Sequence, residues 1–340
     1  MSILLNTRIQ AFEENKNSEI ENKRYELLHY KYLKGFDIAV KSEMKHESGK
    51  YVYLDDIAMI KDMFPLPPWL LRPLKKLDIG YYPVDSLRQS GLADKTVIYL
   101  HGVGGFGDDN SILHAQLLKL NCNVIRLTYH VDFSTEEVIY PSDATAMEPF
   151  LKELEAKVIP VIVEELDEVM QRIVQEYKVL FEDKEILFVA HSLGAGIAAN
   201  YLSAQKVLTA NRFINLDGTL FEPAISQGLN VEQLHLSQEQ NFSEEWLFNE
   251  VEDAHAQIGK DYGRRIDTMI KASDAKCSWL KIGGSNHLTF TDLPDLLKYN
   301  KWMSRHVGEK EAAGRIRNYV TDFIRGKELI ANELLDKRIL

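Results

Sequence analysis

Short apolar runs alternate with longer segments of helical spacing over most of the chain. Helical spacing covers 110–121, 147–181 and 194–205, and Pro160 divides or kinks the second segment because proline has no backbone N–H. Short runs that are nearly all apolar and are separated by helices are typical of a parallel sheet covered on both faces. The pattern therefore predicts an α/β fold with a mostly parallel, doubly wound sheet and flanking helices. The predicted strands are 77–84, 95–102, 122–130, 185–192, 212–218 and 277–284.

The two flanks and one internal segment depart from this alternation. Residues 1–60 are highly charged and predict helices, and the stretch 63–74 has four prolines in twelve residues, which predict a stiff extended connector. The C-terminal segment predicts a helix. Between 222 and 275 polar residues dominate and strand-like runs are few, which predicts a helical cap-like insertion over the sheet. We divide the chain into an N-terminal helical extension with its connector, 1–76, and a main domain, 77–340, that contains the insertion.

Composition and charge narrow the classes of partner. The chain has 340 residues, 45% of them hydrophobic, and a net charge of −11. This charge argues against nucleic acid, because a polyanion repels an acidic protein. Two distant cysteines, Cys122 and Cys277, form no disulfide framework and suit a reducing compartment. The first residues hold too short an apolar run for a secretory signal, and no stretch approaches the roughly 18 apolar residues of a membrane span. These features predict a cytoplasmic protein.

The proline-rich connector carries the apolar side chains Phe64, Trp69 and Leu70. They have two interpretations. The sequence favours packing on the main domain, and weak contact with a membrane surface is the alternative. The sequence indicates no particular oligomeric state.

A polar His-Ser pair ends the predicted strand in the stretch ILFVAHSLGAG, 186–196. A nucleophilic serine needs exposure at the end of a rigid strand, small neighbours that permit a tight turn, and backbone N–H groups aimed at the developing oxyanion. Ser192 fits, because small residues open the next helix. Ser226 occurs in the same Ala-x-Ser-x-Gly pattern, but neither a buried strand nor small residues surround it. Context therefore favours Ser192 as the candidate nucleophile, with an ordinary strand-to-helix loop as the alternative.

A serine becomes a useful nucleophile when a histidine takes its proton and a carboxylate orients that histidine. In doubly wound hydrolases the acid and then the histidine follow the serine in the chain. Asp217 ends the next predicted strand, although an Asp-Gly turn would also explain it. His287 follows the strand 277–284 in a loop containing two glycines, whereas the other downstream histidines lie in the insertion or in a charged helix: His235, His255 and His306.

The glycine-rich stretch HGVGGFGDDNS, 101–111, follows an early predicted strand. Its glycines allow the backbone to approach a substrate. A phosphate cradle is the rival interpretation, but the lysine and the Ser/Thr of a P-loop are missing. We interpret Gly102 and Gly104 as supporting residues of this loop, and His101 and His191 as structural hydrogen-bonding groups. No cluster has the spacing of metal ligands, so we expect neither metal nor cofactor.

Four stretches resemble the α/β-hydrolase superfamily: HGVGG (101–105), AHSLGAG (190–196), LDGTLFEP (216–223) and GSNHLTFTD (284–292). Within it they are most similar to the branch of the platelet-activating-factor acetylhydrolases and the dienelactone-hydrolase-like esterases. The resemblance implies a nucleophile, an acid, a base and an oxyanion hole formed by two backbone N–H groups. These are, in the same order, Ser192, Asp217, His287, and the N–H groups of Val103 and Leu193.

Two features depart from the resembled branch. Position 190 is alanine where the branch has glycine, and the 70-residue separation between Asp217 and His287 is long. The resemblance implies a serine hydrolase that cleaves carboxylic esters, of short-to-medium acyl or lipid-like kind, through an acyl-enzyme and without a cofactor. The alternatives are an acyltransferase or an interfacial lipase with the same three residues, and a non-catalytic binding module of the same fold.

Overall fold

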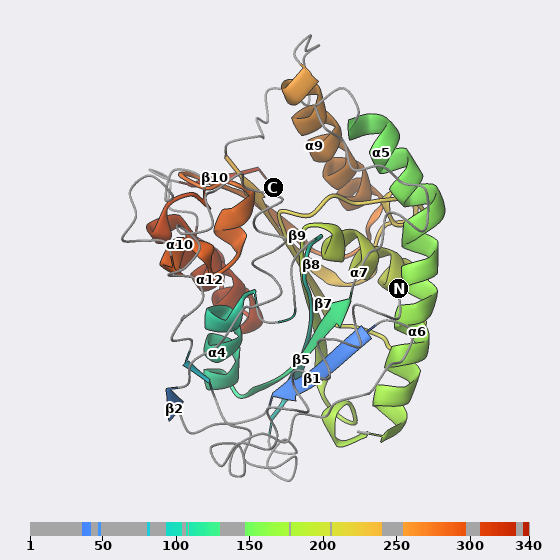
Figure 1. The fold of residues 1–340 in the computed structure, drawn as a ribbon, viewed down its shortest axis with the longest axis vertical. Helices are drawn as coiled ribbons and strands as arrows, with labels where there is room; N and C mark the ends of the chain where they lie inside the picture. The colour runs from blue at the N-terminus through green and yellow to red at the C-terminus, as the bar shows by residue number, and fades with distance from the viewer. Residues whose placement is uncertain are drawn as a thin grey trace, which may run out of the picture.

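An eight-stranded sheet forms the centre of the computed structural model, in the order β1-β5-β4-β6-β7-β8-β9-β10 (Figure 1). The central strands from β5 to β9 pair in parallel, and β1 and β10 add antiparallel edges to β5 and β9. The mostly parallel sheet predicted from the apolar runs is therefore confirmed. The structure describes residues 36–41, 47–48, 80–81, 93–103, 107, 109–129, 147–176, 178–204, 206–239, 254–296, 307–330 and 336–339.

The predicted strands 95–102, 122–130, 185–192, 212–218 and 277–284 each coincide closely with a strand of this sheet. The predicted strand 77–84 is different, because its described residues 80–81 pair in a separate, smaller sheet. A second, two-stranded sheet joins β2 (Glu47–Ser48) and β3 (Gly80–Tyr81). The strands of the main sheet are β1 (Phe36–Lys41), β4 (Lys95–Leu100), β5 (Cys122–Tyr129), β6 (Glu185–His191), β7 (Arg212–Leu216), β8 (Glu232–Gln238), β9 (Cys277–Ile282) and β10 (Asp336–Arg338).

Helices cover both faces of the sheet (Figure 1). On one face lie α5 (Met147–Glu153), α6 (Ile159–Glu176), α7 (Leu193–Ser203) and α9 (Ala254–Ala272). On the other face lie α4 (Ser111–Lys119), α10 (Leu293–Leu296) and α12 (Lys310–Ile324). Shorter helical pieces complete the described part: η3 (Leu154–Val158), η4 (Lys178–Leu180), α8 (Ala224–Gln227) and η6 (His287–Phe290).

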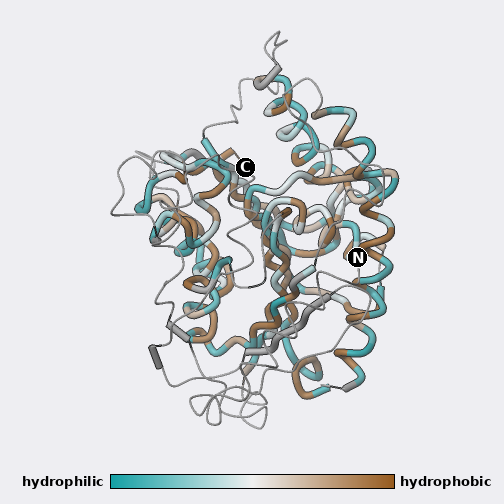
Figure 2. The backbone as a smooth tube through the Cα atoms, in the orientation of Figure 1, coloured by the Kyte–Doolittle hydropathy of each residue, from teal (hydrophilic) through white to brown (hydrophobic). Residues whose placement is uncertain are grey.

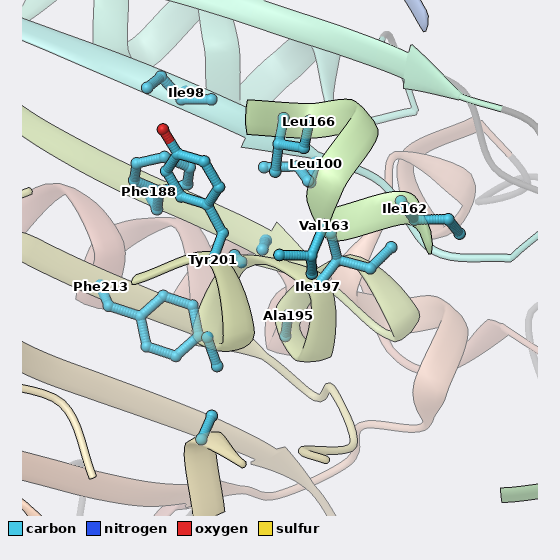
Figure 3. Close-up of a cluster of buried hydrophobic side chains, with 14 of the residues drawn as sticks. Ile98, Leu100, Ile162, Val163, Leu166, Phe188, Ala195, Ile197, Tyr201 and Phe213 are labelled. Atoms are coloured by element: carbon cyan, nitrogen blue, oxygen red, sulfur yellow. The ribbon is translucent and has the colours of Figure 1, made fainter. Parts of the chain in front are cut away.

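Two hydrophobic clusters, one on each face, hold these helices to the sheet, and Figure 2 shows hydrophobic residues gathered in the central strands. The larger cluster lies between the sheet and the helices α6, α7 and α9. In Figure 3 the rings of Phe188 from β6 and Tyr201 from α7 face each other, with their centroids 5.6 Å apart. Residues 186–191 of β6 are all buried. The strand before Ser192 is therefore rigid, and a rigid strand fixes the position of the turn that follows it.

The predicted kink at Pro160 takes the form of a local change in helix type. The π-helical turn η3 separates α5 from α6 and ends two residues before the proline. Proline cannot donate the backbone hydrogen bond that a regular α-helix requires there, and π-turns accommodate such interruptions. The predicted helical segment is thus one interrupted helix.

The segment 222–275 needs correction, because it contains a strand of the main sheet. We expected a helical insertion with few strands, but β8 lies between β7 and β9 and pairs in parallel with both. Its alternate residues Gln233, His235 and Ser237 are polar yet buried. The polar side chains concealed the strand in the sequence pattern.

The two flanks need smaller corrections. Helices were expected over 1–60, but 36–41 forms β1, in which apolar residues alternate with polar or small ones. The C-terminal segment ends in β10 and is not helical throughout. The predicted packing of Phe64, Trp69 and Leu70 concerns connector residues that lie outside the described ones. Among the described residues, no helix combines the length and the apolar character needed to cross a bilayer.

Candidate active site

Ser192 occupies the turn between β6 and α7 at the C-terminal edge of the sheet. Its backbone has φ +55° and ψ −127°, which a residue with a side chain rarely adopts. Two backbone bonds hold the turn: the Ser192 N–H donates to the Leu216 carbonyl at 3.2 Å, and the Ala195 N–H donates to the Ser192 carbonyl at 3.0 Å. Strain at a single fixed residue is common at functional sites, and here it presents the hydroxyl at the end of the strand.

Close packing around this turn depends on two glycines. A methyl group on Gly102 would stand 2.5 Å from the Cβ of Ser192 and 3.1 Å from its Oγ. A methyl group on Gly194 would stand 2.5 Å from the carbonyl oxygen of His101. Both distances are too short for a Cβ atom, so these positions keep the loop after β4 against the Ser192 turn.

His287 lies between the serine and the carboxylate. Its Nε2 is 2.9 Å from Ser192 Oγ, and its Nδ1 is 2.6 Å from Asp217 Oδ2. A carboxylate only accepts, so Nδ1 carries the proton and the Ser192 hydroxyl donates to Nε2. Asn286 begins η6 with a capping box that involves Thr289, which fixes the loop just before the imidazole. The His287 side chain is 40% exposed, so a substrate can reach it.

Asp217 follows β7 and is 2% exposed. It lies in the left-handed region with φ +52°, and its N–H donates to the Leu236 carbonyl at 2.8 Å. Oδ1 accepts from the backbone N–H of Gln238 at 2.9 Å and from the hydroxyl of Tyr262 at 3.2 Å, while Oδ2 accepts from the Gln238 amide at 2.7 Å and from His287. Four donors satisfy a buried carboxylate that would otherwise be costly to desolvate.

His101 and His191 are both tied to backbone groups beside the serine. The Nδ1–H of His101 donates to the Gly102 carbonyl at 2.6 Å, because its Nε2 accepts from the Tyr129 N–H at 3.1 Å. The Nε2–H of His191 donates to the His287 carbonyl at 3.3 Å. Burial, and then the nearby His287, lower the pKa of His191 well below its usual value, so the ring stays neutral. These bonds suit the structural use that the sequence predicts for both histidines.

The two expected oxyanion donors come from adjacent strands. Leu100 at the end of β4 pairs in register with Ala190 of β6, and Val103 and Leu193 each lie three residues beyond that pair. Leu193 is the first residue of α7, and Val103 is half-buried in the turn after β4. The register therefore brings both backbones to the same edge, beside Ser192. Gly104, the remaining loop residue of the prediction, lies outside the described residues.

Ser226, which matches the same short pattern, is not part of this arrangement. It lies in α8, where its hydroxyl donates to the Pro223 carbonyl at 3.2 Å and the residue is exposed.

Two contacts of Asp217 were not predicted from the sequence. Gln238 was missed because β8 was not predicted, and nothing in the sequence around Tyr262 marks its contact with the carboxylate.

Comparison with solved structures identifies the fold. No protein-family model matches the chain, and no curated protein matches its sequence. A solved ferulic acid esterase from Streptomyces cinnamoneus is 15% identical, with a TM-score of 0.57 over 90% of this chain and 89% of that one. A dienelactone hydrolase from Anabaena variabilis is 11% identical, with a TM-score of 0.40 over 63% and 85%. A dienelactone hydrolase-like promiscuous phosphotriesterase from metagenomic libraries is 10% identical, with a TM-score of 0.46 over 69% and 87%. The chain has the α/β-hydrolase fold.

Proposed function

We propose that the protein is a serine hydrolase that cleaves carboxylic esters, with Ser192 as nucleophile, His287 as base and Asp217 as acid. One observation carries the proposal: two hydrogen bonds, of 2.6 and 2.9 Å, link the buried Asp217 carboxylate through His287 to Ser192 on its strained turn. The fold it shares with a solved ferulic acid esterase agrees with this chemistry. We expect short-to-medium acyl or lipid-like esters.

Hydrolysis proceeds in two steps, acylation of Ser192 and deacylation. The His287 Nε2 takes the Ser192 proton as Oγ attacks the ester carbonyl, and the N–H groups of Val103 and Leu193 stabilise the oxyanion. The imidazolium then returns this proton to the departing alcohol, which leaves an acyl-serine. Water then attacks the acyl-serine and gives one proton to Nε2. The imidazolium passes this proton to Ser192 Oγ as the carboxylic acid departs. Asp217 keeps Nδ1 protonated and stabilises the imidazolium throughout.

A p-nitrophenyl ester panel of increasing acyl length tests the reaction, the nucleophile and the acyl preference together. We expect Ser192→Ala to lower kcat by at least about 10⁴-fold on every ester that the wild type hydrolyses. Asp217→Asn should also lower kcat, by about 10⁴-fold, because the amide favours the wrong tautomer of His287. A fluorophosphonate probe should label the wild type and leave Ser192→Ala unlabelled.

Ser226→Ala is the matched control, because this serine has the same short pattern but lies in α8 and bonds only within its own turn among the bonds described. It should hydrolyse the panel at the wild-type rate. Wild-type hydrolysis by Ser192→Ala, or by Asp217→Asn, would refute the proposed function.

A further inference from the structure

We propose that Tyr262 on α9 is a positioning residue, whose hydroxyl orients the Asp217 carboxylate and sets how tightly this carboxylate holds the His287 imidazolium. The inference rests on the proposed function, and it adds to that mechanism a residue more than forty positions along the chain from the acid. Neither the strand pattern nor the resemblance to hydrolases pointed to this tyrosine.

A chain of three hydrogen bonds ends at the acid. Trp279 of β9 donates from its indole N–H to Ser237 Oγ at 2.8 Å. Ser237 Oγ lies 3.0 Å from the Tyr262 hydroxyl, which in turn lies 3.2 Å from Asp217 Oδ1. Trp279 and Ser237 are fully buried, and both belong to central strands of the sheet. The chain therefore has a rigid starting point.

The direction of each bond in this chain follows from donor and acceptor chemistry. The indole nitrogen only donates, and the carboxylate only accepts. The single hydroxyl proton of Tyr262 is therefore directed at Asp217, and the single hydroxyl proton of Ser237 is directed at the Tyr262 oxygen. Hydrogen bonds aligned in this way polarise one another, so the bond that reaches the carboxylate is strengthened.

The Tyr262 hydroxyl stays protonated at every pH at which an esterase would work. Burial, and then the charge of Asp217, raise the pKa of Tyr262 well above its usual value. A hydroxyl that cannot ionise is a permanent donor. The contact with Asp217 is thus a lasting hydrogen bond.

Helix α9 is fixed to the loop after Asp217 at a second point. Arg265, one turn beyond Tyr262, donates to the Leu220 carbonyl at 2.9 Å and to Glu155 of η3 at 3.0 Å. The same Glu155 oxygen accepts the Glu222 N–H at 3.0 Å. Two side chains of one helix face thus bond to the loop 217–222, Tyr262 at Asp217 and Arg265 at Leu220. Such a double attachment limits how far the Tyr262 hydroxyl can move from the carboxylate.

The positioning role has a consequence for the pH dependence of catalysis. Among the residues that the structure describes, the titratable side chains seen facing His287 are Asp217 from the loop after β7 and His191 from β6, whose ring centroid is 4.8 Å from that of His287. His191 is neutral, so Asp217 supplies the charge. Tyr262 takes up part of that charge by donating to Oδ1. Without this donor, the carboxylate holds the imidazolium more tightly, and a higher pH is needed to free the base.

Tyr262→Phe tests the inference, because it removes one hydroxyl and keeps the ring. We expect kcat to fall about tenfold, because the carboxylate loses the donor that orients it and His287 is then held less precisely, with KM little changed. We also expect the acid limb of the kcat/KM profile to move to higher pH. Ser237→Ala keeps the Tyr262 hydroxyl but removes the serine hydroxyl that donates to it. This variant should move the acid limb in the same direction by a smaller amount.

Tyr319→Phe is the matched control. Tyr319 is a buried tyrosine of α12 whose hydroxyl donates to the buried Asp336 at 2.8 Å. It should alter stability without moving the acid limb. A pH profile of folded Tyr262→Phe that superimposes on the wild type would overturn the inference, as would an equal shift in Tyr319→Phe. If Ser192→Ala abolishes hydrolysis in the same assay, the proposed function stands whatever Tyr262→Phe shows.

Discussion

At the scale of single residues, the candidate site depends on how little space surrounds Ser192. The alanine at position 190, where the resembled hydrolases have glycine, is fully buried within the larger hydrophobic cluster. It belongs to β6 and pairs in register with Leu100 and Asn215 on the neighbouring strands. The methyl group is therefore part of the strand's packing, and the strained backbone begins two residues later, at Ser192.

Gly102→Ala should damage catalysis far more than folding. Its added methyl group would stand 2.5 Å from the Cβ of Ser192, so either the loop after β4 or the nucleophile must move. Displacement of a reacting group by about 1 Å typically costs about 100-fold in rate. We therefore expect kcat on a p-nitrophenyl ester to fall about 100-fold.

The steric origin of this loss can be tested against stability. The Gly102 backbone needs no left-handed conformation, so alanine itself is compatible with the chain path there. Circular dichroism should show a folded variant with cooperative thermal unfolding. Wild-type kcat in such a variant would contradict the close packing described around Ser192.

At the scale of elements, the strands that the sequence predicted are those in which apolar residues predominate. β4 and β6 contain uninterrupted apolar runs, because parallel strands are buried on both faces. β8 was not found, because its alternate residues are polar. They can be buried because they are paired: Asn215 of β7 donates to His235 Nδ1 at 3.3 Å, and His235 Nε2–H donates to Gln233 at 3.1 Å. Such pairing appears only when the neighbouring strands are in place, so no pattern within the segment could reveal it.

Gly314→Ala should stabilise α12. Gly314 lies inside this helix, and an added methyl group there would meet nothing within 4 Å. Alanine loses less backbone entropy than glycine on folding, and the difference in a helix interior is about 0.5–1 kcal/mol. Urea denaturation should show a rise in the free energy of unfolding by this amount.

The hydrolysis rate provides the control for the α12 variant. α12 lies on the face of the sheet opposite α7, and no hydrogen bond or ion pair described for it involves Ser192, Asp217 or His287. The kcat of Gly314→Ala should therefore equal that of the wild type. A loss of stability would indicate that the helix packs more tightly at this position than described.

At the scale of the whole molecule, the site is assembled from loops at one edge of the sheet. Ser192, Asp217 and His287 follow β6, β7 and β9, and their order in the chain could be predicted from the sequence. The 70-residue gap between acid and base contains α8, β8, α9 and β9. The contacts that these elements make to Asp217, through Gln238 and Tyr262, depend on packing between distant segments and could not be read from local patterns.

Two buried histidines should make the whole fold sensitive to acid. Burial lowers the pKa of His235 to about 3, and it lowers the pKa of His191 well below 6.5. Above pH 6.5 each histidine is neutral in both the folded and the unfolded state, so neither affects stability. Below pH 6.5 these histidines bind protons in the unfolded chain but not in the folded one. The free energy of unfolding therefore falls by about 1.4 kcal/mol per pH unit for each histidine.

His235→Gln isolates one of these two contributions. Glutamine can accept from Asn215 and donate to Gln233, as His235 does, but it does not titrate in this range. Urea denaturation at pH 7.5 and at pH 4.5 should show a smaller loss of stability in the variant than in the wild type. The difference between the two losses is the contribution of His235, and the remaining loss includes that of His191. If the two proteins lose the same stability, His235 binds its proton in the folded state. That result would contradict its burial in β8, between β7 and β9.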